Sequence, residues 1–178
     1  MLVALVLAAL AATAAGAASV TTITGAVAGG SALSVAPNGT PGFSLTLNGV
    51  DQVAGYTLPV EAIDPRGTGA GWNLTITSTQ FSDGAGHRFA ANASTIASAS
   101  NGCGPSSTCT TAVNSVGYTG LVLPAGMTPP TPIKFFNAGA ASGLGTVDVN
   151  AAVSVAVPAN AYAGTYTSTV TVSIVAGP

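Results

Sequence analysis

Trp72-Asn-Leu-Thr-Ile-Thr-Ser-Thr-Gln-Phe81 contains the chain's only tryptophan and alternates apolar with polar side chains. Trp72, Leu74 and Ile76 fall on one face of an extended chain, and the residues between them fall on the other. This period of two predicts a β-strand with one buried face. A lone tryptophan on such a strand is usually a core residue. We therefore expect the indole ring inside the protein and any binding function on the surface around it.

Residues 64–71, directly before this stretch, read Asp-Pro-Arg-Gly-Thr-Gly-Ala-Gly. Glu61 and Asp64 both lie near Arg66 in sequence, which favours a structural ion pair over the acid/base pair of a glycosidase. The three glycines differ from a phosphate-binding loop because they precede a strand and not a helix. We interpret residues 64–71 as a close turn bracketed by Asp64 and Arg66.

Period-two alternation continues over most of the chain, and no stretch beyond the N-terminus has helical spacing. Clusters of Gly, Pro, Asn and Asp separate the runs, which is typical of antiparallel sheets. The sequence predicts an all-β fold, a single antiparallel β-sandwich of the Ig-like or jelly-roll-like kind. Clear runs cover residues 43–49, 56–62, 72–81, 147–157 and 166–174, and weaker runs cover 93–97, 112–118, 120–123 and 133–137.

The connections between these runs carry two further expectations. Residues 147–157 and 166–174 would form the final hairpin, joined by the loop 158–164. Residues 101–132 hold both cysteines and a Pro-rich stretch, so their composition predicts a long excursion over the surface.

Charged side chains are scarce, at 4% of the 178 residues against about 25% in ordinary soluble domains. Hydrophobic residues reach 48%, which is enough for one domain with a sizeable core. Disordered chains are instead rich in charge and poor in β-branched and aromatic residues. Because Lys and Arg together number 3, the basic patch that nucleic acid or anionic lipid requires cannot form, and we exclude nucleic acid as a partner.

Cys103 and Cys109 are the two cysteines of the chain, within a segment of Gly, Pro, Ser and Thr. A metal site would need further ligands, and the chain offers a single histidine, His87, and no second cysteine pair. A local disulfide is therefore favoured over a metal site. Such a bond is typical of an oxidising compartment.

Residues 1–18 are apolar and uncharged, and we place a domain boundary after them. Residues 2–10 are typical of a signal-peptide core, and residues 15–17 have the small-x-small pattern that precedes a cleavage site. A transmembrane helix needs about 20 apolar residues, so a span is marginal. The segment is either a signal peptide or a retained apolar element, with membrane contact only in the second case, and residues 19–178 form the β-sandwich domain.

Residues suited to catalysis are few. His87 has Asp83 and many serines around it in sequence but no Gly-x-Ser-x-Gly elbow, so we interpret it as a solvated loop histidine. Calcium would have to be held by Asp64, Asp83 and loop carbonyls without an Asp-x-Asp-x-Asp run. We predict no enzymatic activity, no cofactor and no metal. The other carboxylates considered for a glycosidase pair are Asp51, Glu61 and Asp148.

Residues 60–74 resemble the first Trp-x-Leu motif of the WxL-domain proteins of bacterial cell surfaces. Trp72 and Leu74 match the motif itself, while Asp64 and Arg66 match the strand-ending Asp and the Arg-Gly turn before it.

Residues 157–174 resemble the segment that closes this family's domain. Tyr166 lies in its Gly-Thr-Tyr stretch, Val172 stands near the position of a second tryptophan, and Ile174 stands for the leucine, so the second motif is degenerate. The resemblance implies a secreted, β-rich protein that attaches non-covalently to the peptidoglycan of Gram-positive bacteria. It implies binding roles for Asp64, Arg66, Trp72, Leu74 and Tyr166.

Two functions from different classes remain open. The leading hypothesis is a secreted, non-catalytic surface module that binds peptidoglycan or another glycan of the cell envelope. The alternative is a structural subunit of an extracellular filament, pilus or surface layer. Such a subunit would self-associate by donating a strand such as residues 19–27, or through the apolar N-terminal segment. The low charge and the Ser/Thr-rich strands motivate this alternative.

Overall fold

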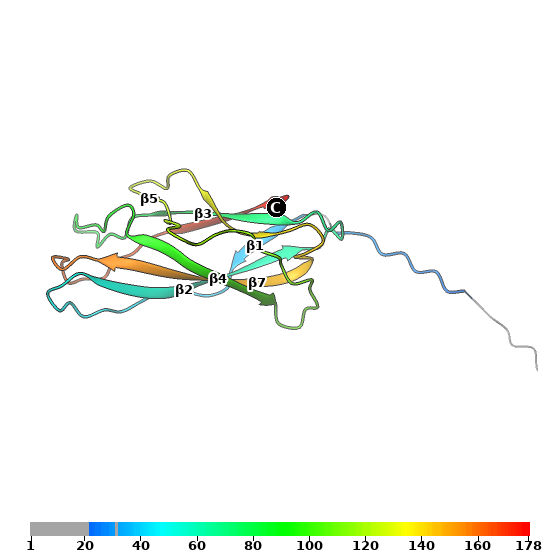
Figure 1. Cartoon of the computed structure of the whole chain (residues 1–178), viewed down its shortest axis with the longest axis horizontal. Helices are drawn as coiled ribbons and strands as arrows, with labels where there is room; N and C mark the ends of the chain where they lie inside the picture. Colours follow the sequence, from blue (N-terminus) through cyan, green and yellow to red (C-terminus); the bar gives the residue numbers. More distant parts are fainter. Residues whose placement is uncertain (1–21, 31) are drawn as a thin grey trace, which may run out of the picture.

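Two β-sheets packed face to face form the protein in the computed structural model, which describes residues 22–30 and 32–178 (Figure 1). The first sheet contains, in spatial order, β1 (Ser34–Pro37), β2 (Gln52–Asp64), β7 (Gly145–Val157) and β4 (Ser94–Cys103). In the second sheet, β3 (Trp72–Thr79) pairs with β8 (Val170–Ala176) on one side and with β6 (Ile133–Ala138) and β5 (Ala125–Gly126) on the other. Every strand pair except β3–β5 is antiparallel. The predicted all-β sandwich is confirmed.

The pair β2–β7 forms the centre of the first sheet. Each β2 residue from Gln52 to Asp64 has a partner in β7, which runs from Val157 back to Gly145. Alternate residues of both strands turn their side chains into the interior, as the pleat of a strand requires. The runs at 56–62 and 147–157 are therefore confirmed as strands, and both extend beyond the predicted bounds.

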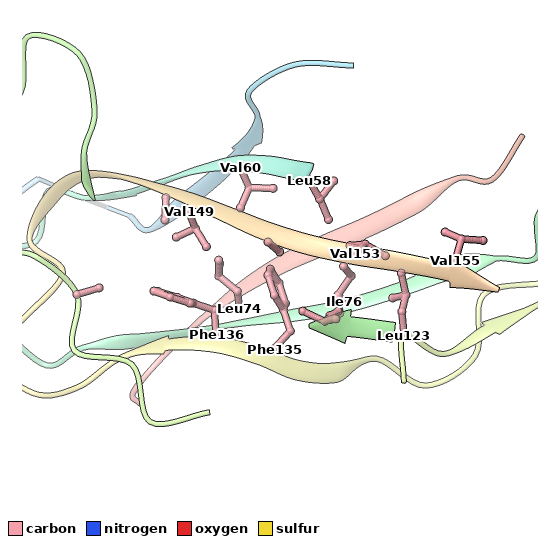
Figure 2. Packing of buried hydrophobic residues seen from close by; sticks show 14 of the residues in the cluster. Leu58, Val60, Leu74, Ile76, Leu123, Phe135, Phe136, Val149, Val153 and Val155 are labelled. Atoms are coloured by element: carbon pink, nitrogen blue, oxygen red, sulfur yellow. The ribbon is translucent and has the colours of Figure 1, made fainter. Parts of the chain in front are cut away.

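The hydrophobic core lies between the sheets, where side chains of β3 and β6 face those of β7 (Figure 2). A β-bulge in β6 opposite the Leu74–Thr75 step leaves Phe135 outside the regular register. Consecutive residues of a regular strand point to opposite faces, but a bulge removes this constraint. As a result, Phe135 and Phe136 are both fully buried. The side chains that fill the core around them include Leu74, Ile76, Val149, Val153 and Val155.

The expected final hairpin is wrong. Strand β7 belongs to the first sheet and β8 to the second, so the intervening residues cross from one sheet to the other. The reason is that β2 and β4 already occupy both edges of β7, which leaves no free edge for a hairpin partner. Strand β8 pairs with β3 instead, and Ile174 lies opposite Leu74.

Three other predicted strands are absent from the described residues. Residues 43–49, 112–118 and 120–123 form no ladder, although Val122 makes one isolated bridge to Thr95. In the first of these runs the alternation has a different cause, because Phe43 and Leu47 pack on the core without strand pairing. The weaker runs at 93–97 and 133–137 are confirmed as parts of β4 and β6.

The segment 101–132 is more deeply integrated than its composition suggests. It begins as the end of β4 and later supplies β5 to the second sheet. Between them, Leu123 is 1% exposed and belongs to the core, and Ala112 is held by two hydrogen bonds to the Asn101 side chain. The prediction of a surface excursion is therefore wrong for residues 101–103, which belong to β4, and for residues 123–126, which belong to the core and to β5.

Residues 22–30 are exposed; Gly30 donates its backbone N–H to the Pro65 carbonyl, and the chain before it extends away from the sandwich in Figure 1. Of the segment 19–27 considered as a donated strand, residues 19–21 lie outside the described part, and the rest forms no strand within this chain. The apolar segment 1–18 also lies outside the described residues. No helix within 22–30 and 32–178 is long and apolar enough to span a membrane.

Leu74→Ala should lower the free energy of unfolding by about 2–5 kcal/mol, since it leaves a cavity at a fully buried position. Urea unfolding followed by Trp72 fluorescence measures the change. Thr171→Ala, at an exposed position of the neighbouring strand β8, is the control and should shift stability by less than about 0.5 kcal/mol. Equal effects of the two substitutions would contradict the packing described here.

Candidate functional site

The residues predicted to form a binding site lie at two opposite ends of the sandwich. Strand β2 ends at Asp64 and β3 begins at Trp72, so these residues and Arg66 share one end. Tyr166 precedes β8, whose first residue Val170 pairs with Ser78 near the far end of β3. The structure therefore separates Tyr166 from the other predicted site residues by the length of a strand.

A buried ion pair closes the turn between β2 and β3. Arg66 donates Nε to Oδ1 and Nη2 to Oδ2 of Asp64, both at 2.8 Å, and Nη2 also donates to the Gly71 carbonyl at 2.9 Å. The Asp64 side chain is inaccessible to solvent, and that of Arg66 is 17% exposed. The hydrogen-bonded guanidinium holds the pKa of Asp64 below its usual value, although burial acts in the opposite direction. The predicted ion pair is confirmed, with Asp64 as the partner.

The glycines of this turn are required by its backbone. Gly67, Gly69 and Gly71 have φ angles of 68°, 65° and 73°, in the left-handed region that favours glycine. At Gly71 a Cβ atom would also lie 2.4 Å from the Ala138 carbonyl oxygen. The interpretation of residues 64–71 as a close turn is confirmed.

Trp72 fills the core at this end. Its ring is fully buried, and Nε1 donates a hydrogen bond to the Gly143 carbonyl at 2.9 Å, which satisfies the one polar atom of the indole. A Cβ atom on Gly143 would lie 2.7 Å from Nε1, so only glycine fits there. Leu74 is equally buried. The Trp-x-Leu residues therefore face the core and not the solvent.

The predicted disulfide is present at the same end. Cys103, the last residue of β4, is bonded to Cys109, and both thiols are consumed. Gly145 at the start of β7 lies against this bridge, since a Cβ atom there would be 3.5 Å from Cβ of Cys109. The disulfide closes a short loop that packs on the first residues of β7.

The opposite end of the sandwich, on the left in Figure 1, contains a groove of about 820 Å³. We call it the aromatic groove. It lies where β2 begins, β7 ends and β8 begins, so the interior between the sheets opens to solvent there. Residues 41–47 and 161–168 complete its walls. Its aromatic residues are Phe43, Tyr56, Phe81, Phe89, Tyr162 and Tyr166.

Ring stacking orders these side chains. Tyr166 stacks on Phe89 with 4.3 Å between ring centroids, and its hydroxyl donates to the Tyr162 carbonyl at 3.1 Å. Phe43 contacts the rings of Tyr56 and Phe81. Burial raises the pKa of Tyr56 to about 12.

Comparison with protein families identifies the fold. Residues 44–178, which include all of the sandwich except β1, match the family model described as WxL domain surface cell wall-binding. This chain belongs to the WxL family. No curated protein and no solved structure matches it significantly. The resemblance seen in the sequence is confirmed, and membership in this family indicates a location at the cell surface and a partner in the cell envelope.

In this WxL domain the two halves of the family pattern lie on adjacent strands. Val172 and Ile174 of the degenerate second motif pair with Ile76 and Leu74 in the β3–β8 ladder. Both are partly buried against the core. The second motif thus supports the strand that carries the first.

His87 is in a loop, as predicted, but its ring is anchored. Its Nδ1 lies 2.5 Å from Oδ2 of Asp83, and its ring stacks on Tyr162 with 3.7 Å between centroids. The side chain is 38% exposed. The hydrogen bond from His87 lowers the pKa of Asp83. Among the described residues no hydrogen bond joins this ring to a serine or threonine hydroxyl.

The remaining carboxylates form no cluster of three within the described residues. Asp64 and Asp83, considered together for calcium, lie at opposite ends of the WxL domain and bind Arg66 and His87, respectively. Glu61 lies opposite Asp148 in the β2–β7 ladder, on the outer face of the first sheet. Within the described part of the chain no three Asp, Glu, His or Cys side chains cluster closely enough to hold a metal ion.

Sequence reasoning missed most of the aromatic groove. The chain has 5 Phe and 4 Tyr residues, and six of these nine line the groove. They are scattered between positions 43 and 166, so no local motif unites them. Their residue type was the available signal, because aromatic side chains are enriched at binding surfaces.

Asp64→Asn should lower the free energy of unfolding by about 3 kcal/mol at neutral pH, because it leaves the charge of Arg66 uncompensated. The folded pKa of Asp64 is lowered, so its stabilisation is present above the unfolded value of about 3.9 and is lost as pH falls through the folded pKa. The difference between wild type and variant should therefore shrink as the solution is acidified. Urea unfolding at several pH values measures it.

Asp83→Asn is the matched control for this experiment, since it removes a carboxylate from the more exposed Asp83–His87 pair. We expect a much smaller loss of stability there. The prediction is wrong if the stability lost by Asp64→Asn does not change with pH, or if the two variants lose equal stability. Either result would show that the buried ion pair is not the source of the stabilisation.

Proposed function

We propose that this protein is secreted and attaches non-covalently, without catalysis, to the peptidoglycan of a Gram-positive cell wall. The match of residues 44–178 to a cell wall-binding family carries this proposal. The local chemistry is compatible with it, because Asp64 and Arg66 pair with each other in the turn, and Asp83 is held by His87.

The proposed attachment depends on the predicted site residues in two ways. Asp64, Arg66, Trp72 and Leu74 act by holding the fold, since their side chains are buried or nearly so. Tyr166 lines the aromatic groove and is the member of the set that lies where a ligand can contact it.

We further propose that residues 1–18 direct export and are removed. Their sequence has the apolar core and small-residue cleavage pattern of a signal peptide. Mass spectrometry of the protein recovered from the culture medium or the wall tests this. A mass lower by that of residues 1–18 supports the proposal, and retention of these residues contradicts it.

Purified peptidoglycan should retain the folded domain in a sedimentation assay. Because charged residues make up 4% of the chain, contacts depend on hydrogen bonds and apolar surface, and retention should persist at salt concentrations that screen ion pairs. Insoluble cellulose, a neutral glucan without acetamido groups, is the control support. If a folded sample is not retained, the proposed function is refuted. If moderate salt elutes the protein, binding depends on ion pairs and not on hydrogen bonds and apolar contacts.

A further inference from the structure

The aromatic groove has the size and position of a ligand site. Its volume of about 820 Å³ falls within the range of small-molecule and cofactor pockets. It is continuous with the core, because Tyr56 of β2 and Val157 of β7 occupy inward-facing positions of their strands and also line the groove. The rigid sheets therefore hold its floor. This placement favours a preformed site, which binds with a lower ordering cost than a flexible loop.

The lining of the groove specifies the charge of its ligand. None of its lining residues is Asp, Glu, Lys, Arg or His. An anionic polymer such as a polyol phosphate would therefore find no counter-charge, and burying its phosphates there would be unfavourable. The groove favours a neutral ligand.

Aromatic faces and hydroxyls are interspersed along the groove. Ser44, Thr46, Thr165 and Thr167 are hydroxyl-bearing residues that line it beside the aromatic rings. Tyr56 also lines this space, and its hydroxyl makes no hydrogen bond to another described residue. Sugars have the matching pattern, because a pyranose ring presents apolar C–H groups on its face and hydroxyls at its edge. Such a ring stacks on an aromatic side chain while hydroxyls around it exchange hydrogen bonds.

Tyr162 is the ring best placed for this contact. It lines the groove and is 63% exposed. One face of the ring is covered by His87, which is itself held by Asp83 and does not line the groove. This exposure leaves ring surface for a ligand on the side away from His87, and the stacking contact with His87 orients the ring.

We propose that the aromatic groove binds a neutral segment of a wall glycan, of the N-acetylhexosamine type, with a sugar ring stacked on Tyr162. This inference rests on the proposed function and assigns the contact to the end of the domain opposite the Trp-x-Leu motif. An apolar peptide is the competing occupant, since Ile23 and Val27 of the exposed N-terminal segment are 91% and 101% accessible. The density of hydroxyls in the groove favours the saccharide.

The test uses the full chain and a soluble β-1,4-linked tetrasaccharide of N-acetylglucosamine, with affinity measured by calorimetric titration. Tyr162→Ala should weaken binding by about tenfold, the loss expected of an aromatic contact in a binding site. Tyr56→Phe, which keeps the ring and removes the hydroxyl, should weaken it by about fivefold. Met127→Ala is the control, since Met127 is 75% exposed and does not line the groove, and it should leave affinity unchanged.

Trp72 provides the folding control, because it is buried at the opposite end and its fluorescence should be the same in every variant. Equal affinity of wild type and Tyr162→Ala for the tetrasaccharide would overturn the proposal, as would the absence of any binding. Binding of a peptide of residues 22–30 or of poly(glycerol phosphate) in place of the saccharide would overturn the ligand class.

Retention on whole peptidoglycan, measured in parallel, separates this inference from the proposed function. If wild type and Tyr162→Ala are retained equally, wall attachment stands and the groove is not its site. If neither is retained while the tetrasaccharide binds with the expected ranking of variants, the groove is a saccharide site and the proposed attachment to peptidoglycan fails.

Discussion

The bidentate ion pair between Asp64 and Arg66 is the constraint on which the rest of the structure depends. It stabilises a turn in which three glycines have left-handed backbone angles, and its third hydrogen bond, to the Gly71 carbonyl, holds the residue directly before Trp72. Removing one partner of such a buried pair costs about 3–5 kcal/mol, a large part of the net stability of a domain. The turn places Trp72 inside the sandwich and sets the start of β3, the strand to which β5, β6 and β8 are all paired.

The two ends of the WxL domain have different properties. At one end Trp72 fills the interior, and the Gly143 carbonyl satisfies its indole nitrogen. At the other end the interior remains open as the aromatic groove, with stacked rings along it. The residues that identify the family are therefore those that build the fold, and the ligand contact that we propose involves other residues. A substitution in the Trp-x-Leu motif would impair binding through the stability of the domain.

The strands were predictable where both faces of the chain have a constant environment. β2, β3 and β7 alternate over many residues because each has one side against the core, and the turn at 64–71 was recognisable from its glycines and charges. Residues 43–49 alternate for another reason, since Phe43 and Leu47 pack on the core from a segment without strand pairing. Periodicity reports which side chains are buried, and it contains no information about hydrogen bonds between strands.

The amino-acid sequence by itself determined the fold class, the buried tryptophan, the Asp64–Arg66 turn, the disulfide and the family, because each depends on residues close together in the chain. Only the tertiary structure decided that β8 pairs with β3 and not with β7, since that choice depends on which strand edges are already occupied. It also decided that six aromatic residues, far apart in sequence, share one groove. Long-range contacts of this kind follow from how the sheets pack, which no local pattern records.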